Sequence, residues 1–244
     1  MTTNRFFGAL LAAILVLTVH FAPAAAPGFL PPPQDDNPSA QQEQENKKSA
    51  IPRALRWYKG RQIAQTMHYL GAEWLIRNER EREERCSMML TNLGIRHGMT
   101  ICDMGCGNGY HTLRMAELTG KNGQVFGVDV QAEMLGFLRQ RMEDQNITNV
   151  IPILGSFHDP RLPPESVDLI LMVDVYHEFS HPEQMLAAMR RALKPNGLIA
   201  LVEYRAEDKT VPIKRLHKMS KAQIMKEYPP NGFKLVREFD RLPW

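Results

Sequence analysis

The 244-residue chain has little of several features that mark specialised classes of protein. Three cysteines are too few for a disulfide framework. A net charge of +3 is too small to predict nucleic-acid binding. The almost unbroken apolar run from Phe6 to Val19 is shorter than the about 20 residues that a membrane-spanning helix needs. The remaining composition, 43% hydrophobic and 23% charged, predicts an ordinary globular protein with one α/β domain and additional segments.

That apolar run has the features of a secretory signal. Arg5 precedes it, and the small residues of Ala22–Ala26 follow it as a candidate cleavage site. We therefore predict that residues 1–26 direct export to the periplasm or the medium, or anchor the chain in a membrane if they are not cleaved. Residues 27–50 hold almost no apolar side chains and are predicted to form a disordered linker, because burial cannot offset their ordering entropy.

The rest of the chain divides into two parts. Between Arg53 and Gly94 apolar residues recur at roughly helical spacing, so residues 51–94 are predicted to form a helical cap. Within it, the charged run Arg77–Arg85 is expected to be a solvated helix face. From residue 95 to residue 244, short apolar runs alternate with helix-like segments, which is typical of a parallel α/β sheet.

The most informative stretch lies at the start of this second part, from Thr100 to Gly109. An apolar run that contains Asp103 leads into a loop with Gly105, Gly107 and Gly109, and a helix-like segment follows. Glycines at alternate positions let a ligand lie directly against the backbone, close to the positive end of the helix. The pattern is D-x-G-x-G-x-G. It is not the dinucleotide pattern G-x-G-x-x-G, because Tyr110 stands where the third glycine would be.

Two further acids follow predicted strands. Asp129 ends the run Gln124–Asp129, about 20 residues after the glycine loop, where an acid binds ribose hydroxyls in nucleotide-binding folds. The same carboxylate could cap the next helix. Asp174 lies near the end of Leu169–Val175, an apolar run typical of a central strand, and Val150–Leu154 contains a proline and is expected at a sheet edge.

Together these motifs resemble the class I S-adenosylmethionine (SAM)-dependent methyltransferases, over about residues 92–241. The resemblance implies a doubly wound, mostly parallel Rossmann-like sheet with helices on both faces, and helices before the glycine loop that cover the active site. It implies that Asp103, Gly105, Gly107 and Gly109 hold the methionine end of SAM. It also implies a seventh, antiparallel strand, but no residues remain after Phe239 to form it, so we expect that strand to be missing.

The resemblance places further residues around the cofactor. Ser156 would hydrogen-bond the adenine, Phe157 would pack on its ring, and Asp174 would lie at the binding site. His177 and Glu178 would then lie near the transferable methyl group, where a histidine could act as a base. An acceptor that is already reactive needs no base, and proximity then suffices. We therefore predict methyl transfer to a small molecule, with no nucleic-acid partner and no metal.

Two other functions remain open at this point. The export signal raises the alternative of a secreted, catalytically inactive binding module on the same fold. His177-Glu178-Phe-Ser-His181 also matches the zinc-hydrolase motif H-E-x-x-H, which requires both histidines on one helix. Here the motif follows a predicted buried strand and Pro182 comes directly after it, so the zinc-hydrolase interpretation is the weakest of the three.

Overall fold

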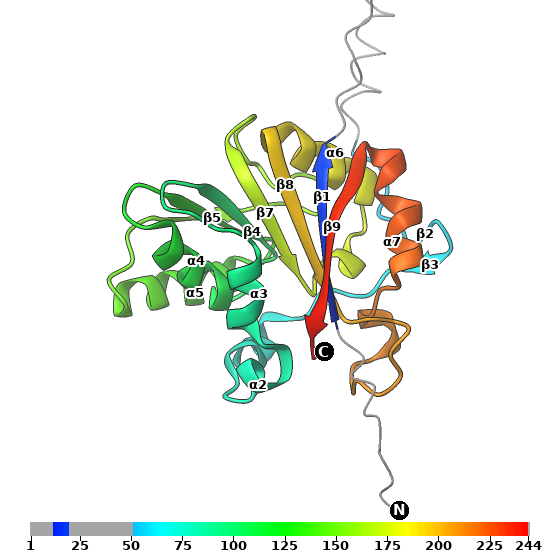
Figure 1. The fold of residues 1–244 in the computed structure, drawn as a ribbon, viewed down its shortest axis with the longest axis horizontal. Coiled ribbons are helices and arrows are strands. Elements are labelled where there is room, and N and C mark those ends of the chain that lie inside the picture. Colours follow the sequence, from blue (N-terminus) through cyan, green and yellow to red (C-terminus); the bar gives the residue numbers. More distant parts are fainter. Residues whose placement is uncertain (1–11, 20–50, 244) are drawn as a thin grey trace, which may run out of the picture.

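The computed structural model describes residues 12–19 and 51–243 (Figure 1). Seven strands form one sheet in the order β6-β5-β4-β7-β8-β1-β9. The five strands from β6 to β8 are parallel to one another, as a doubly wound sheet requires. The strands are β1 (Ala12–Val19), β4 (Thr100–Met104), β5 (Gln124–Asp129), β6 (Val150–Leu154), β7 (Val167–Val173), β8 (Leu193–Glu203) and β9 (Phe233–Leu242).

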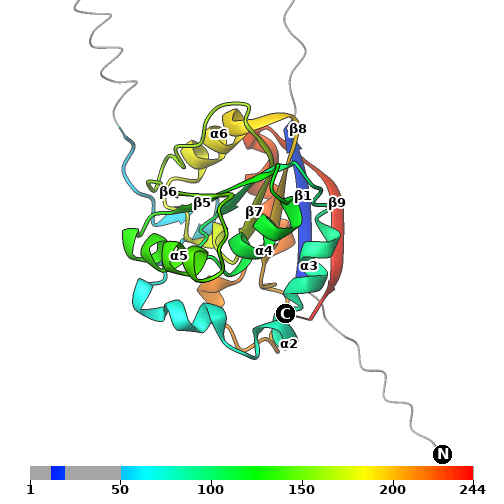
Figure 2. The same ribbon diagram turned by 90° about the vertical axis from the view of Figure 1, so that its left-hand side faces the viewer.

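Helices cover both faces of this sheet (Figures 1 and 2). Successive strand residues alternate between two apolar cores, one under α3, α4 and α5 and the other under α6 and α7. In β4, for example, Ile101 packs in the first core and Cys102 in the second. The helices are α3 (Cys86–Asn92), α4 (Tyr110–Thr119), α5 (Ala132–Asp144), α6 (Pro182–Ala192) and α7 (Lys221–Glu227).

The antiparallel strand that we expected to be missing is present, and that prediction is wrong. β1, from the N-terminal apolar run, lies between β8 and β9 and is antiparallel to both. Leu15 and Leu17 point into one core and Val16 into the other, so the run has the two-residue period of a strand buried on both faces. The prediction failed because it considered only residues after β9 for this strand and interpreted the N-terminal apolar run as an export signal. Export and a cleaved signal stay predictions, and the predicted linker lies outside the described residues.

Within residues 51–94, which were predicted to form a helical cap, only the second half is helical. Residues 53–68 are not helical: β2 (Trp57–Tyr58) and β3 (Arg61–Gln62) form a hairpin whose turn, Lys59-Gly60, has positive φ at both residues. Backbone groups of this segment bond to distant partners instead of to the next helical turn, as Ala64 N does to His177 O. The 3₁₀ helix η1 (Tyr69–Ile76), the short helix α2 (Arg80–Glu84) and α3 follow.

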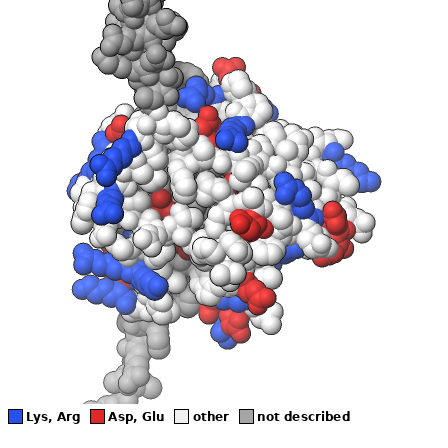
Figure 3. All heavy atoms as spheres, turned by 180° about the vertical axis from the view of Figure 1, so that it is seen from behind, with Lys and Arg blue, Asp and Glu red and all other residues white. Residues whose placement is uncertain are grey.

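β6 lies at the edge of the sheet, as its proline predicted. Ser220 caps α7, because its side chain accepts a hydrogen bond from Gln223 N. Among the residues that the structure describes, none of the helices is both long and apolar enough to span a membrane. On the face shown in Figure 3, basic side chains gather along one margin and both signs are mixed elsewhere.

Candidate functional site

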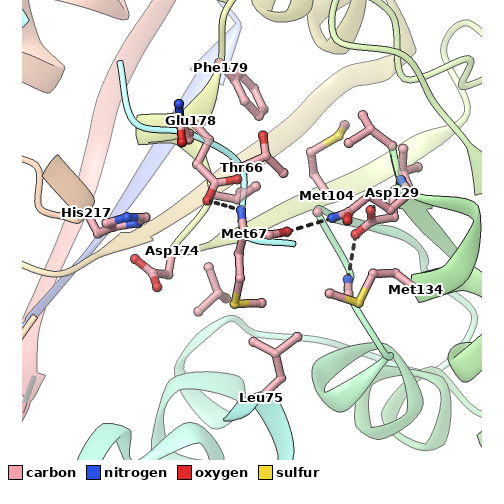
Figure 4. A pocket seen from close by; sticks show the side chains of 18 of the residues that line it. Thr66, Met67, Leu75, Met104, Asp129, Met134, Asp174, Glu178, Phe179 and His217 are labelled. Carbon is pink, nitrogen blue, oxygen red and sulfur yellow. Dashed lines mark hydrogen bonds between the residues drawn. The ribbon is translucent and has the colours of Figure 1, made fainter. Parts of the chain in front are cut away.

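A cavity of about 570 Å³ opens at the carboxyl ends of β4, β5 and β7 (Figure 4). This is the edge where open α/β sheets bind ligands, and the volume suits a nucleoside-sized molecule. Six of the eight predicted cofactor residues lie on its wall, namely Gly105, Gly107, Asp129, Ser156, Phe157 and Asp174. Asp103 and Gly109 do not.

The glycine loop is tied to the end of β5. Gly105 N and Cys106 N both donate to Val128 O, at 2.8 and 2.9 Å. Gly105 has a φ of +70°, and a Cβ there would lie 2.3 Å from Val175 Cγ2. Gly109 has a different use: it precedes α4, and a Cβ would lie 2.4 Å from Leu138 Cδ1 of α5. Contact with Val175 therefore excludes a side chain at Gly105, and the φ of +84° favours glycine at Gly109.

Asp129 is the polar group that joins the loop to the cavity. One carboxylate oxygen accepts a hydrogen bond from Gly107 N and the other from Gln131 N, both at 2.9 Å. The side chain is 7% exposed, and its burial raises the pKa of this carboxyl group. The predicted helix cap and the predicted ribose contact do not exclude each other, because each oxygen has a second acceptor site that remains for a ligand.

Asp103 lies below the loop and not at the cavity surface. It is 3% exposed, and Thr112 Oγ1 donates a hydrogen bond of 2.6 Å to it. Burial raises the pKa of Asp103 to about 6, although the bond from Thr112 and the nearby Arg80 guanidinium both act to lower it. Its charge can act on a ligand through the loop, but the structure gives it no direct access to the cavity.

The turn after β6 contributes Ser156 and Phe157. Ser156 Oγ accepts a hydrogen bond from Asp159 N at 3.1 Å, and Ser156 N donates to Asp159 O at 2.8 Å, so the turn is closed by its own bonds. Phe157 is 49% exposed and lies on the cavity wall, where its ring can cover a flat ligand.

The opposite end of the cavity is rich in acids and histidines (Figure 4). His177 Nδ1 and Glu203 Oε2 are 2.7 Å apart, and His177 Nε2 faces His217 Nδ1 at 3.0 Å. Glu178 Oε1 is 3.9 Å from His177 Nε2. Asp174 has a φ of +56°, and its side chain is 25% exposed, yet its Oδ1 atom is enclosed and has no hydrogen-bond partner.

Burial and mutual charge shift the ionisation of this group. Burial alone would lower the pKa of His177, but the Glu203 carboxylate outweighs it and raises the pKa to about 9. Burial raises the pKa of Glu178 to about 7 and that of Asp174 to about 8, against the nearby His177. Burial and the neighbouring His177 lower the pKa of His217. Such a concentration of shifted groups in a cavity is typical of functional sites.

Sequence reasoning missed Glu203 and His217. Glu203 ends β8, so the rule that ligand-binding residues follow parallel strands could have found it. His217 lies in a 3₁₀ turn, η3 (Arg215–His217), about 40 residues after His177, and no local pattern indicated it.

The H-E-x-x-H segment does not form a zinc-hydrolase site. His177 and Glu178 end a 3₁₀ turn, η2 (Tyr176–Glu178), and not a helix that continues to His181. His181 Nε2 instead lies 2.8 Å from Pro52 O, and its Nδ1 lies 3.0 Å from Ser180 Oγ. The geometry that the motif requires is therefore absent.

A strap formed by residues 65–69 crosses the cavity between its two ends (Figure 4). Met67 N donates to Glu178 Oε1 at 3.1 Å, and Gln131 Nε2 donates to Met67 O at 2.8 Å. Tyr69 N donates to Gln131 Oε1 at 2.9 Å. The strap is thus fixed to the acidic end through Glu178 and to the Asp129 end through Gln131.

The structure is that of a doubly wound α/β protein with a cavity of nucleoside size at the carboxyl ends of its parallel strands. A family model described as a methyltransferase domain matches residues 95–239. The chain is 34% identical over 117 residues to an uncharacterized 37.1 kDa protein in transposon TN4556 of Streptomyces fradiae, a match that covers 48% of this chain and 33% of that protein. It is 26% identical over 153 residues to the ubiquinone/menaquinone biosynthesis C-methyltransferase UbiE of Stutzerimonas stutzeri, covering 60% of this chain and 59% of the relative.

Among solved structures, a SAM-dependent methyltransferase from Aquifex aeolicus superposes with a TM-score of 0.67 at 23% identity, covering 70% of this chain and 92% of that one. The chain therefore belongs to the methyltransferase domain family. Its fold is that of the SAM-dependent methyltransferases, which use SAM as the methyl donor, and this confirms the predicted family and fold class. The matches span about a third to three fifths of the curated relatives' own lengths.

Proposed function

We propose that this protein transfers a methyl group from SAM to a small-molecule acceptor. The observation that carries the proposal is one cavity with two unlike ends: Gly105, Gly107 and Asp129 at one, and Asp174 and Glu178 at the other. An enclosed site that holds a nucleoside beside a separate polar compartment suits a two-substrate transfer.

The residues present fit SAM. The loop backbone at Gly105 and Gly107 approaches the cavity without side chains, as a ligand cradle requires. Asp129 would accept hydrogen bonds from the ribose diol, and Phe157 would cover the adenine, with Ser156 beside it. Asp103 would act on the cationic methionine end through the loop. When bound, SAM supplies a methyl group that is activated by its positive sulfur.

The chain's own residues then have to position an acceptor and keep water away. Met67 and the rest of the strap cover the cavity, so that the acceptor lies in a site partly shielded from solvent. Of the two residues predicted to be catalytic, Glu178 remains the proposed catalytic group, and His177 is proposed to position it. His177 itself is not on the wall but lies behind it, bonded to Glu203 and His217, so its effect on the acceptor is exerted through Glu178 and His217.

A small acceptor is favoured because the cavity is enclosed by the strap, by η1 and by the segment from Pro212 to His217. UbiE, to which the chain is similar, is named for methylation of carbon in quinone biosynthesis. An oxygen-bearing small molecule is therefore a reasonable first class to test, and no feature of the described residues favours a macromolecule.

The proposal is tested with the full-length chain and SAM labelled in its methyl group. Calorimetric titration should show one SAM site, and incubation with extracts of small metabolites should transfer label to a product. SAM binding without any transfer across broad extracts would favour the inactive binding module. Failure to bind SAM at all would contradict the proposed function.

A further inference from the structure

The group at the acidic end of the cavity has the geometry of a metal site. Nε2 of His177, Nδ1 of His217 and a carboxylate oxygen of Glu178 all lie within 4.8 Å of one another. Around a tetrahedral ion with bonds of about 2.1 Å, ligand atoms stand about 3.4 Å apart. The observed separations of 3.0 Å (His177–His217) and 3.9 Å (His177–Glu178) bracket that value.

The environment of His177 supports this interpretation. Its Nδ1 is paired with Glu203 Oε2 at 2.7 Å, which favours the tautomer that carries the proton on Nδ1. When an ion replaces the proton on Nε2, the lone pair of that nitrogen lies on the side of His217 and Glu178. In metal sites, a ligating histidine commonly donates the N–H of its other ring nitrogen to a carboxylate, which fixes the ring orientation. Glu203 has this position relative to His177. Glu203 is itself held by a hydrogen bond of 2.8 Å from Tyr176 N.

A second observation concerns Asp174, which is not one of the three proposed ligands but lies beside His177. Asp174 Oδ1 is enclosed, has no hydrogen-bond partner, and lies 3.7 Å from His177 Nδ1. A buried carboxylate oxygen without a partner is costly, and a positive charge at this end of the cavity would lower that cost. Figure 4 shows Asp174, Glu178 and His217 at the same end of the cavity.

We propose that His177, Glu178 and His217 bind one divalent transition-metal ion, with Zn²⁺ as the best match. Two imidazoles and one carboxylate are a ligand set for Zn²⁺ sites that keep an open position, whereas Mg²⁺ prefers oxygen ligands alone. Glu178 and His217 lie on the cavity wall, so the open position faces the acceptor compartment. This metal site differs from the zinc-hydrolase motif, because His181 is not one of its ligands.

The metal site also predicts an acceptor class, and this prediction rests on the proposed function. The acceptor is a small molecule with a hydroxyl group that binds the ion through oxygen. On binding, the hydroxyl loses its proton to water, because a bound cation lowers its pKa. An electron pair of that oxygen forms the new bond to the methyl carbon. The carbon–sulfur bond breaks, and its electrons remain on sulfur, which becomes a neutral thioether.

The test begins with metal binding, which does not depend on methyl transfer. The untagged full-length chain is stripped with a chelator and titrated with Zn²⁺, Mn²⁺ and Mg²⁺ by calorimetry, and with Co²⁺ by visible spectroscopy. We expect one Zn²⁺ site, much weaker Mg²⁺ binding, and a Co²⁺ spectrum of low coordination number. Glu178→Gln and His217→Ala should each weaken Zn²⁺ binding about 100-fold, and Glu203→Gln about 10- to 100-fold.

His97→Ala is the matched control, because His97 is exposed and lies beside Gly120, outside the cavity. It should bind Zn²⁺ like the unaltered chain. Equal Zn²⁺ affinity in the His97, His217 and Glu178 variants would overturn the metal site, as would the absence of a one-equivalent site in the unaltered chain. SAM titration of the metal-free chain separates the two proposals: SAM binding without Zn²⁺ binding refutes only the metal site, and no SAM binding refutes the proposed function.

Discussion

At the scale of single residues, the two acids of the predicted cofactor site have different positions. Asp129 faces the cavity with both oxygens anchored by backbone N–H groups, whereas Asp103 is enclosed beneath the loop and bonded to Thr112. Both acids lie at the ends of buried strands that reach the cavity. Asp129 is the last residue of β5, whereas Asp103 precedes Met104, the last residue of β4, and its side chain turns to Thr112. Substitution at the two positions should therefore have different effects.

Asp129→Ala should weaken SAM binding about 10- to 100-fold, because each hydrogen bond from a ligand to a charged group contributes about 1.5–3 kcal/mol. The fold should survive, since the backbone bonds of Gly105 and Cys106 to Val128 remain. Calorimetric titration measures the affinity. Asp144→Ala, at an exposed position of α5, is the control. Unchanged SAM affinity in the Asp129 variant would remove the ribose assignment.

Asp103 should make folding stability depend on pH in a narrow window. The pKa of Asp103 is about 6 in the folded chain and about 3.9 in an unfolded one. The folded state therefore prefers the protonated form, and the contribution of this residue to stability falls by about 2 kcal/mol as pH rises from 4 to 6. Urea unfolding of the unaltered chain and of Asp103→Asn across this range should show a stability difference that changes by about that amount. A difference that stays constant from pH 4 to pH 7 would refute the shift.

At the scale of elements, the strap is the part of the molecule that decides access to the cavity. Gln131, directly before α5, binds the strap through its side-chain amide. Its Nε2 donates to Met67 O, and its Oε1 accepts a hydrogen bond from Tyr69 N. Asp129 in turn accepts from Gln131 N, so the ribose-facing acid, the cap of α5 and the strap form one hydrogen-bonded unit. Loosening Gln131 should therefore affect a bound cofactor without touching the glycine loop.

Gln131→Ala removes two hydrogen bonds, worth about 1 kcal/mol each. We expect SAM to dissociate about 10-fold faster and a protease to cut the strap, residues 65–69, more readily. Stopped-flow release of SAM and limited proteolysis measure the two effects. Gln140→Ala, on the exposed side of α5, should behave like the unaltered chain. Equal release rates for both variants would show that the strap does not hold the cofactor.

Elements also show which parts of the fold were predictable. The β4–loop–α4 unit and β5 with Asp129 follow from local patterns of apolar residues, glycines and acids. The segment that includes Trp57 and Tyr58 does not, because its backbone bonds reach residues more than 100 positions away, such as Ser180 and His177. The same holds for the site: Glu203 and His217 approach His177 only through the folded sheet.

At the scale of the whole molecule, β1 determines whether the sheet is complete. Without it, β8 and β9 would expose unpaired backbone groups, which promotes aggregation. The same residues were predicted to be an export signal, and cleavage after Ala26 would remove the strand. The segment cannot be both a strand of the mature sheet and a cleaved signal. Measuring the stability of the chain with and without this segment therefore distinguishes the two roles.

A chain that begins at residue 27 should be far less stable than the full-length chain. Leu15, Val16 and Leu17 are all buried, and burial of such a side chain contributes about 1.5–3 kcal/mol. Their loss, about 5–9 kcal/mol, approaches the whole stability of a typical domain. Thermal melts should show a midpoint lower by at least about 10 °C, or no cooperative transition.

Leu17→Asp should reproduce much of this loss, because it buries an unpaired charge in the core. Leu118→Asp, at an exposed position of α4, should change little. Equal midpoints for residues 1–244 and 27–244 would show that β1 does not stabilise the sheet and would leave the segment free to act as a cleaved signal.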